Sequence, residues 1–137
     1  MKFLKYFPLF AIVLITYNIV AFIGTSHQQS VLTSSLFTIN LFSGASFGLT
    51  VESFLIIVGL HVLYFNILKS TRSTVDSMIS QALAVTVFMV FIIQFIVVER
   101  AGTPHFLILT LMSMLDVIGG FTIAVSSARR DVAITHE

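Results

Sequence analysis

The sequence predicts an all-α fold: a polytopic membrane protein built as an antiparallel bundle of four transmembrane helices, with a short interfacial helix between the first two. Three observations predict it. Of the 137 residues, 57% are apolar and only 9% are charged, whereas about a quarter of the residues in a soluble domain are charged. The apolar residues form four continuous runs, and nearly all basic residues lie on one side of these runs. We therefore expect a single transmembrane domain over residues 1–137.

Four segments are long and apolar enough to cross the hydrocarbon core of a bilayer, which takes about 20 residues of helix. They are approximately residues 7–26, 47–68, 79–98 and 105–126. Helices are favoured over barrel strands because the runs are continuous, whereas a lipid-facing barrel strand alternates polar and apolar residues. A helix also satisfies all of its backbone hydrogen bonds by itself within lipid.

The first span leaves one alternative open. "MKFLK" followed by an apolar run also resembles a signal peptide. The run is longer than the usual hydrophobic region of such a peptide, and no A-x-A cleavage site follows it. We therefore expect an uncleaved span.

The connections between the spans differ in length. "KSTRSTVDS" (69–77) and "ERAGTP" (99–104) are short, which predicts that spans two, three and four are antiparallel neighbours. Thr103 is a candidate N-cap of the fourth helix, and Pro104 suits its first turn.

The connection over 27–46 is longer and apolar. Within it, Leu32, Leu36 and Ile39 recur at helical spacing, which predicts an interfacial helix over 31–43 that lies on the membrane surface and ends at "SGAS". The alternative is a loosely ordered apolar loop.

The basic residues predict the orientation of the bundle. Six of the seven lie before span one, between spans two and three, or after span four: Lys2, Lys5, Lys69, Arg72, Arg129 and Arg130. Only Arg100 lies on the other side. By the positive-inside rule, both termini and the 69–77 turn are expected in the cytoplasm.

Span four carries a carboxylate, Asp116, near its centre. At about 100° per residue, small and polar residues fall on the same side of the helix as Asp116 and form a predicted helix-packing stripe. These are Ser113, Gly119, Gly120 and Ser127. We expect this side to face the bundle or a partner, and Gly119–Gly120 to mark close helix packing.

Span two carries two polar stripes. One holds Glu52, Gly59 and Asn66 at a seven-residue step, and the other holds Thr50, His61 and Tyr64. Two stripes on one helix predict contacts on two sides, with two neighbours or with a neighbour and another chain.

Depth along the spans predicts an intramembrane polar layer made of Asp116, His61 and Asn18, one from each of three helices. A charge at mid-membrane is costly and rarely faces lipid, so Asp116 is a functional candidate. In one interpretation a buried Asp116–His61 pair carries protons or a cation. In the other, Asp116 makes a structural hydrogen bond to a neighbouring helix.

The sequence lacks the residues that most catalytic and cofactor-dependent chemistry requires. The sequence has no cysteine, no HExxH, no GxSxG and no phosphate-binding glycine-rich loop, so we expect no enzyme and no cofactor. A haem at His61 would need a second histidine at matched depth, and none is predicted. For a metal, only His105 with Glu99 has plausible proximity. A net charge of +1 without a basic stripe gives no reason to expect nucleic acid.

Two stretches resemble a known group of proteins. "LKSTRS" (68–73) and "LTLMSMLDVIGGFTIAVSSARRD" (109–131) are similar to small four-span inner-membrane proteins of proteobacteria that have no assigned activity. The resemblance implies four helices and a bacterial inner membrane, and it supplies no catalytic residue. Small multidrug transporters are similar only in architecture, because their working glutamate lies in the first span, where this sequence has no acidic residue.

These observations predict a non-enzymatic membrane protein that packs against partners in the lipid bilayer. It would be an accessory or assembly subunit of a larger membrane complex, or would associate with copies of itself. The alternative is a small ion- or proton-coupled transporter or channel that uses Asp116 and His61.

Overall fold

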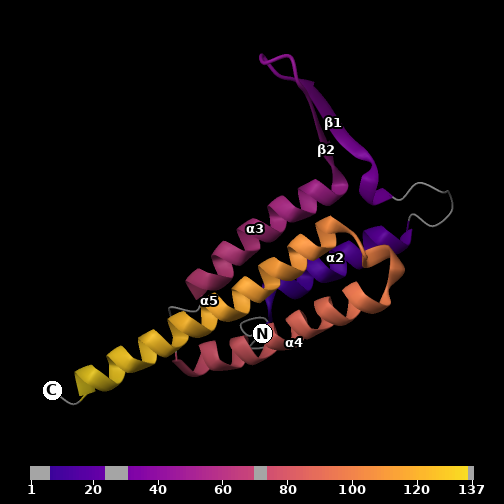
Figure 1. The fold of residues 1–137 in the computed structure, drawn as a ribbon. Coiled ribbons are helices and arrows are strands. Elements are labelled where there is room, and N and C mark those ends of the chain that lie inside the picture. Colours follow the sequence, from indigo (N-terminus) through magenta and orange to yellow (C-terminus); the bar gives the residue numbers. More distant parts are fainter. Residues whose placement is uncertain (1–6, 24–30, 70–73, 136–137) are drawn as a thin grey trace.

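The computed structural model describes residues 7–23, 31–69 and 74–135. In these ranges there are four α-helices: α2 (Leu9–Ile23), α3 (Val51–Lys69), α4 (Thr74–Val97) and α5 (Pro104–Thr135). Two short 3-10 helices, η1 (Val31–Thr33) and η2 (Glu99–Ala101), and two strands, β1 (Ser35–Asn40) and β2 (Ser46–Thr50), complete the fold. Figure 1 shows the helices side by side and the strand pair projecting from one end of them.

Three of the helical segments are long and apolar enough to cross a membrane: Val51–Lys69, Met78–Val97 and Pro104–Ile123. Helix α2 is also apolar, but its 15 residues are fewer than a full crossing takes. The chain is therefore a helical membrane protein. The second predicted span begins at Val51 and not at residue 47, because residues 46–50 belong to strand β2.

The order of the helices in space differs from their order in the sequence. Helix α5 lies between α3 and α4 and packs against both, while α3 and α4 barely touch (Figure 1). Consecutive helices run in opposite directions, so α3 and α5 are parallel neighbours. The prediction that spans two, three and four are all antiparallel neighbours is wrong in this respect, because a short link fixes direction but leaves room for a third helix between the two that it joins.

Aromatic side chains form the centre of the bundle. Phe106 of α5 is fully buried, and its ring lies 4.8 Å from that of Tyr17 and 5.4 Å from that of Phe91, measured between centroids. Phe10 meets Phe91 edge to face at 6.1 Å. This cluster joins α2, α4 and α5 at tilted and edge-on ring geometries, which aromatic pairs prefer.

The connection between α2 and α3 is a β-hairpin and not the predicted interfacial helix over 31–43. Strands β1 and β2 pair antiparallel, with Ile39 opposite Phe47 and Asn40 opposite Ser46. The fold is therefore not purely α-helical. Leu32, the first residue of the supposed helical stripe, lies buried in η1 against the helical core.

The hairpin turn explains why a helix does not form here. Gly44 has a φ of +86°, a conformation that favours glycine, and its N–H donates to the carbonyl of Leu41 at 2.9 Å. The N–H of Leu41 in turn donates to the carbonyl of Ala45 at 2.9 Å. This is a β-turn closed by a glycine of positive φ, a common hairpin connection. In the "SGAS" segment, residues 43–45 thus complete the hairpin turn and Ser46 begins β2, so the segment does not end a helix.

Candidate functional site

The interface between α3 and α5 holds polar contacts at both ends and a glycine between them. Its α3 side is the predicted stripe of Glu52, Gly59 and Asn66, and all three residues meet α5. We call this interface, together with His105, Leu109, Met112 and Asp116 of α5, the α3–α5 seam. Because the two helices are parallel, the contacts follow in the same order along both helices.

Asp116 lies at one end of the seam and is 3% exposed. The Nδ2 group of Asn66 donates a hydrogen bond to its Oδ2 at 3.1 Å. A buried carboxyl group thus has a polar partner on the neighbouring helix, which favours the structural interpretation of Asp116.

Glycines let α5 approach both of its neighbours. A Cβ atom at Gly59 would lie 3.1 Å from side-chain atoms of Leu109 and of Met112. At Gly120, on the side of α5 that faces α4, a Cβ would overlap the side-chain amide of Gln81. At Gly119 it would only touch Ile67 of α3, at an ordinary 3.7 Å. Close helix packing is therefore seen at Gly120 and not at Gly119, and each glycine faces a different helix.

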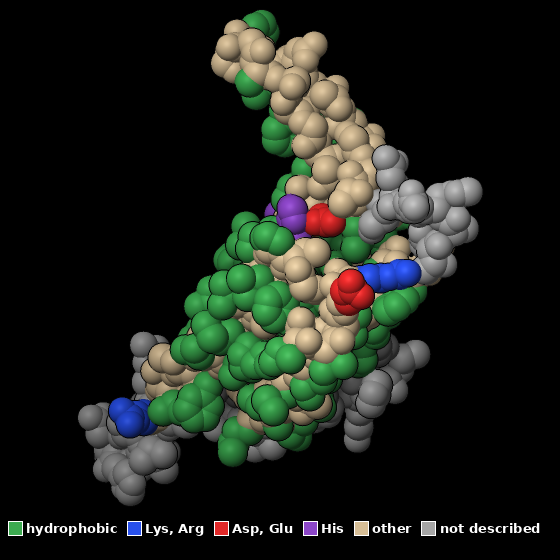
Figure 2. Space-filling model, turned by 45° about the vertical axis from the view of Figure 1, so that its right-hand side comes forward, with side chains coloured by type: hydrophobic (Ala, Val, Ile, Leu, Met, Phe, Trp, Pro, Cys, Tyr) green, Lys and Arg blue, Asp and Glu red, His purple; other side chains and the backbone are tan. Residues whose placement is uncertain are grey.

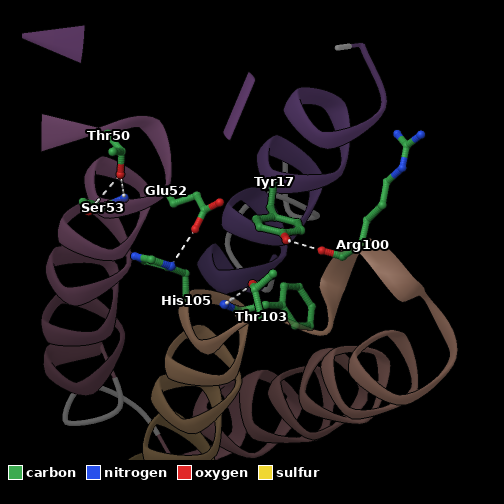
Figure 3. A network of polar contacts seen from close by, with 8 residues as sticks. Tyr17, Thr50, Glu52, Ser53, Arg100, Thr103 and His105 are labelled. Carbon is green, nitrogen blue, oxygen red and sulfur yellow. Dashed lines mark hydrogen bonds and ion pairs between the residues drawn. The ribbon is translucent and has the colours of Figure 1, made fainter. Parts of the chain in front are cut away.

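At the other end of the seam, Glu52 and His105 form a close pair, shown in Figure 3. Oε2 of Glu52 lies 2.6 Å from Nδ1 of His105, and the Glu52 side chain is only 8% exposed against 40% for His105. The sequence offers Glu99 as the one plausible metal-binding neighbour of His105, but the structure places Glu52 beside it, because α5 begins beside the first turn of α3.

At the same end of the bundle, Tyr17 and Arg100 connect α2 to η2. The Tyr17 hydroxyl donates to the backbone carbonyl of Arg100 at 3.4 Å and also interacts with the Thr103 side chain (Figure 3). Arg100 returns to α2, because its Nη1 donates to the Ala21 carbonyl at 3.0 Å and its guanidinium lies 5.5 Å from the ring centroid of Phe22.

Helix capping at this end follows the sequence. Thr103 accepts a hydrogen bond from the Phe106 N–H at 3.3 Å, so the predicted N-cap of α5 is confirmed. Thr50 does the same for α3, accepting from the N–H of Ser53 at 3.3 Å (Figure 3). Strand β2 therefore passes directly into α3, with its last residue as the helix cap.

Asn18 pairs with Gln94 and not with the acid on α5. Nε2 of Gln94 donates to Oδ1 of Asn18 at 2.6 Å, and Nδ2 of Asn18 donates back to Oε1 of Gln94 at 3.1 Å. This reciprocal amide pair joins α2 to α4 within the apolar part of the bundle. The sequence placed Asn18 near mid-span but did not predict that it meets Gln94.

His61 lies on the exposed surface of α3. Its Nδ1 is 2.8 Å from the carbonyl of Ile57 in its own helix, and it makes no polar contact with Asp116 in the part of the chain described. The predicted layer of Asp116, His61 and Asn18 is therefore not assembled. Asn18 lies near the η2 end of the bundle beside Gln94, Asp116 meets Asn66 further along α5, and His61 faces outward, so the three residues have three different surroundings.

The residues of the predicted packing stripe on α5 do not all face the same neighbour. Ser113 is 1% exposed, and its Oγ has no hydrogen-bond partner among the described residues. Gly119 and Gly120 face different helices, as above. The side chain of Ser127 lies outside the described part of the molecule.

Metal-ligating residues do not gather in the described ranges. No group of three or more His, Asp or Glu side chains there is arranged to hold a metal ion. The polar residues form pairs between helices, and the chemistry that these pairs supply is hydrogen bonding across helix interfaces.

The fold and these contacts define the class: a small helical membrane protein whose helices are joined by buried polar pairs. No family model matches the chain, and neither a curated protein nor a solved structure is similar to it.

Proposed function

We propose that this protein is a non-enzymatic accessory or assembly subunit of a bacterial inner-membrane complex and acts by packing its helices against a partner. The observation that carries this proposal is the position of His61. It lies near the middle of an apolar helix long enough to cross a membrane, and it is exposed on the outer surface of the bundle.

An ionisable side chain within a transmembrane helix normally faces protein or water, because lipid cannot solvate it. The backbone carbonyl of Ile57 contacts one ring nitrogen of His61, and in the described ranges the other nitrogen has no partner. A neighbouring protein that covers this surface would supply the missing hydrogen bond.

The rest of this surface suits a helix of another membrane protein. Exposed side chains recur every three or four residues along α3 and define its outward face: Phe54, Ile57, His61, Tyr64 and Leu68. Tyr64 is 60% exposed and adds a second hydrogen-bonding group one turn from His61. One of the two predicted stripes thus faces α5, and His61 and Tyr64 of the other face outward.

The proposal includes four crossings, with both termini and the 69–77 turn in the cytoplasm. Described basic residues support this arrangement. Lys69 and Arg129 lie toward one end of the bundle and Arg100 at the other, and Figure 2 shows mainly apolar side chains between the charged ends. The transport alternative depends on an Asp116–His61 pair. In the described residues, Asp116 bonds to Asn66 and His61 to Ile57, so this pair does not support transport.

Photo-crosslinking in native membranes tests the proposal. A photoreactive phenylalanine analogue replaces Tyr64 on the outward face of α3 or, as a matched control, Ile93, which is 56% exposed on α4. We expect a discrete adduct with another membrane protein from position 64 and none from position 93. We also expect His61→Leu to weaken the adduct.

Four results decide against the accessory role. If position 64 gives no adduct, or if both positions give the same weak ladder of products, the outward face of α3 contacts only lipid. An adduct of twice the chain's own mass would identify a second copy as the neighbour. A chain that always migrates alone in mild detergent would contradict every form of the proposal.

A further inference from the structure

The β-hairpin has one apolar and one polar face. Residues opposite one another in an antiparallel pair lie on the same side of the sheet, and successive residues alternate. The register therefore places Phe37, Leu49, Ile39 and Phe47 on one face. Beyond the register irregularity at Leu36, the other face carries polar or small residues: Thr38, Gly48, Asn40 and Ser46.

The described part of the chain leaves most of the apolar face uncovered. Phe37, Ile39 and Phe47 are 47%, 51% and 46% exposed, and only Leu49, at the base of the hairpin, is buried. Phe42 in the turn is fully exposed. Figure 2 shows apolar side chains along one margin of the hairpin, and the rest of its visible surface is polar side chain and backbone.

The position of the hairpin is fixed by α3. This helix has 19 residues, which span about 28 Å at roughly 1.5 Å per residue, close to the thickness of about 30 Å of a hydrocarbon core. Strand β2 ends at Thr50 and α3 begins at Val51, so no linker separates them. The base of the hairpin must therefore lie at the boundary between hydrocarbon and head groups.

The hairpin also turns away from the helices at this boundary. Figures 1 and 2 both show it leaving the end of α3 sideways, not continuing along the direction of the helix. A segment that leaves a transmembrane helix sideways at its end stays near the level of the membrane surface.

Two environments are excluded by simple physics. Full insertion into hydrocarbon would leave the outer backbone edges of a two-stranded sheet without hydrogen bonds. Extension into water would expose an apolar face on a two-stranded sheet, which is marginally stable alone. The interface offers lipid to one face and water to the other, and residues 28–51 contain no charged side chain to oppose such contact.

We infer that the hairpin lies flat on the bilayer surface at this end of the helices, continuous with their lipid-facing surface. Phe37, Ile39 and Phe47 dip into the boundary between head groups and acyl chains, and Thr38, Asn40 and Ser46 face water. The hairpin thus anchors α3 at a fixed depth. This inference does not depend on the accessory role proposed above.

Tryptophan fluorescence tests the inference cleanly, because the chain contains no tryptophan. Phe47→Trp and Ile39→Trp place the probe on the apolar face, and Thr38→Trp is the matched control on the polar face. The full-length variants are reconstituted at low density in phosphatidylcholine vesicles. Quenching is then measured with lipids brominated on the acyl chain and with aqueous acrylamide.

We expect brominated lipid to quench the fluorescence of tryptophan at positions 47 and 39 strongly, and acrylamide to quench it weakly. At position 38 we expect the reverse. Equal quenching at all three positions would overturn the inference. If residues 47 and 39 are shielded from both quenchers, and the shielding is lost when the vesicles are diluted with more lipid, a second copy covers the face instead. If acrylamide reaches residues 47 and 39 freely, the hairpin stands in water.

Discussion

The α3–α5 seam and the β-hairpin place their side chains in opposite environments. In the seam, Glu52, Asn66 and Asp116 lie between helices and each meets a polar partner. In the hairpin, large apolar side chains such as Phe37 and Phe47 are about half exposed. The seam is complete within one chain, whereas the hairpin depends on what surrounds it. The comparison teaches that stability of the helices and attachment to the surroundings belong to different parts of this molecule.

Replacing Phe106 with alanine would be the strongest test that the helices carry the stability. Phe106 is fully buried, and its ring contacts Tyr17, Phe91 and Phe95. We expect Phe106→Ala to lower the free energy of unfolding by about 3 kcal/mol, since the cavity remains costly in lipid. Steric-trapping measurements in bicelles would show this. Phe47→Ala in the hairpin is the comparison. If Phe106→Ala lowers the free energy of unfolding no more than Phe47→Ala does, the two regions do not differ in stability.

The neighbouring glycines of α5 sharpen the comparison within the helices. A side chain at Gly120 overlaps Gln81, whereas at Gly119 it makes ordinary contact with Ile67. We expect Gly120→Ala to destabilise the bundle by about 1–2 kcal/mol through overpacking. Gly119→Ala should be neutral or stabilising by up to about 1 kcal/mol, because alanine favours helix. Unfolding in mixed micelles with increasing SDS would rank the two, and the reverse order would contradict the packing described.

A double-mutant cycle measures the polar pair of the seam. We expect Asn66→Leu and Asp116→Leu to show a coupling energy of about 0.6 kcal/mol, the average for hydrogen bonds between transmembrane helices. His61→Leu with Asp116→Leu is the matched control, and its coupling should be near zero, since the structure shows no contact between these residues. Strong coupling between residues 61 and 116 would restore the predicted polar layer and with it the transport alternative.

The smallest effect on the helices is expected from the hairpin turn. Gly44 has a φ of +86°, so Gly44→Ala strains the turn by about 1 kcal/mol. Faster hydrogen exchange of the amides of β1 and β2 should report this strain, while the unfolding of the helices stays unchanged. If the helices unfold more easily as well, the hairpin takes part in the stability of the bundle.

The apolar helices were predictable because their signal is continuous along the chain. Runs of about 20 apolar residues located α3, α4 and α5, and Thr103 correctly marked the start of α5. The hairpin was missed because Leu32, Leu36 and Ile39 fit a helical period, while Phe37 and Ile39 alternate with Thr38 and Asn40 as in a strand. A short apolar run fits both patterns. Gly44 after Ser43 was the signal that could have decided for a hairpin.

The burial of some polar residues was predictable, but their partners were not. Asp116 was correctly expected on a buried face, and the step from Glu52 through Gly59 to Asn66 marked the side of α3 that meets α5. Which helices lie next to one another decides the pairs, and short links do not determine this. Asn18 therefore met Gln94, and His61 faced outward.

The parallel seam has a consequence for biosynthesis. Asn66 leaves the ribosome 50 residues before Asp116, which at about 5–20 residues per second is a delay of several seconds. During this interval Glu52 and Asn66 have emerged, but α5, which carries His105 and Asp116, has not yet been made. Until the last helix arrives, the contacts of Glu52 with His105 and of Asn66 with Asp116 cannot form, so a ribosome that stalls before α5 would release a product that lacks the seam.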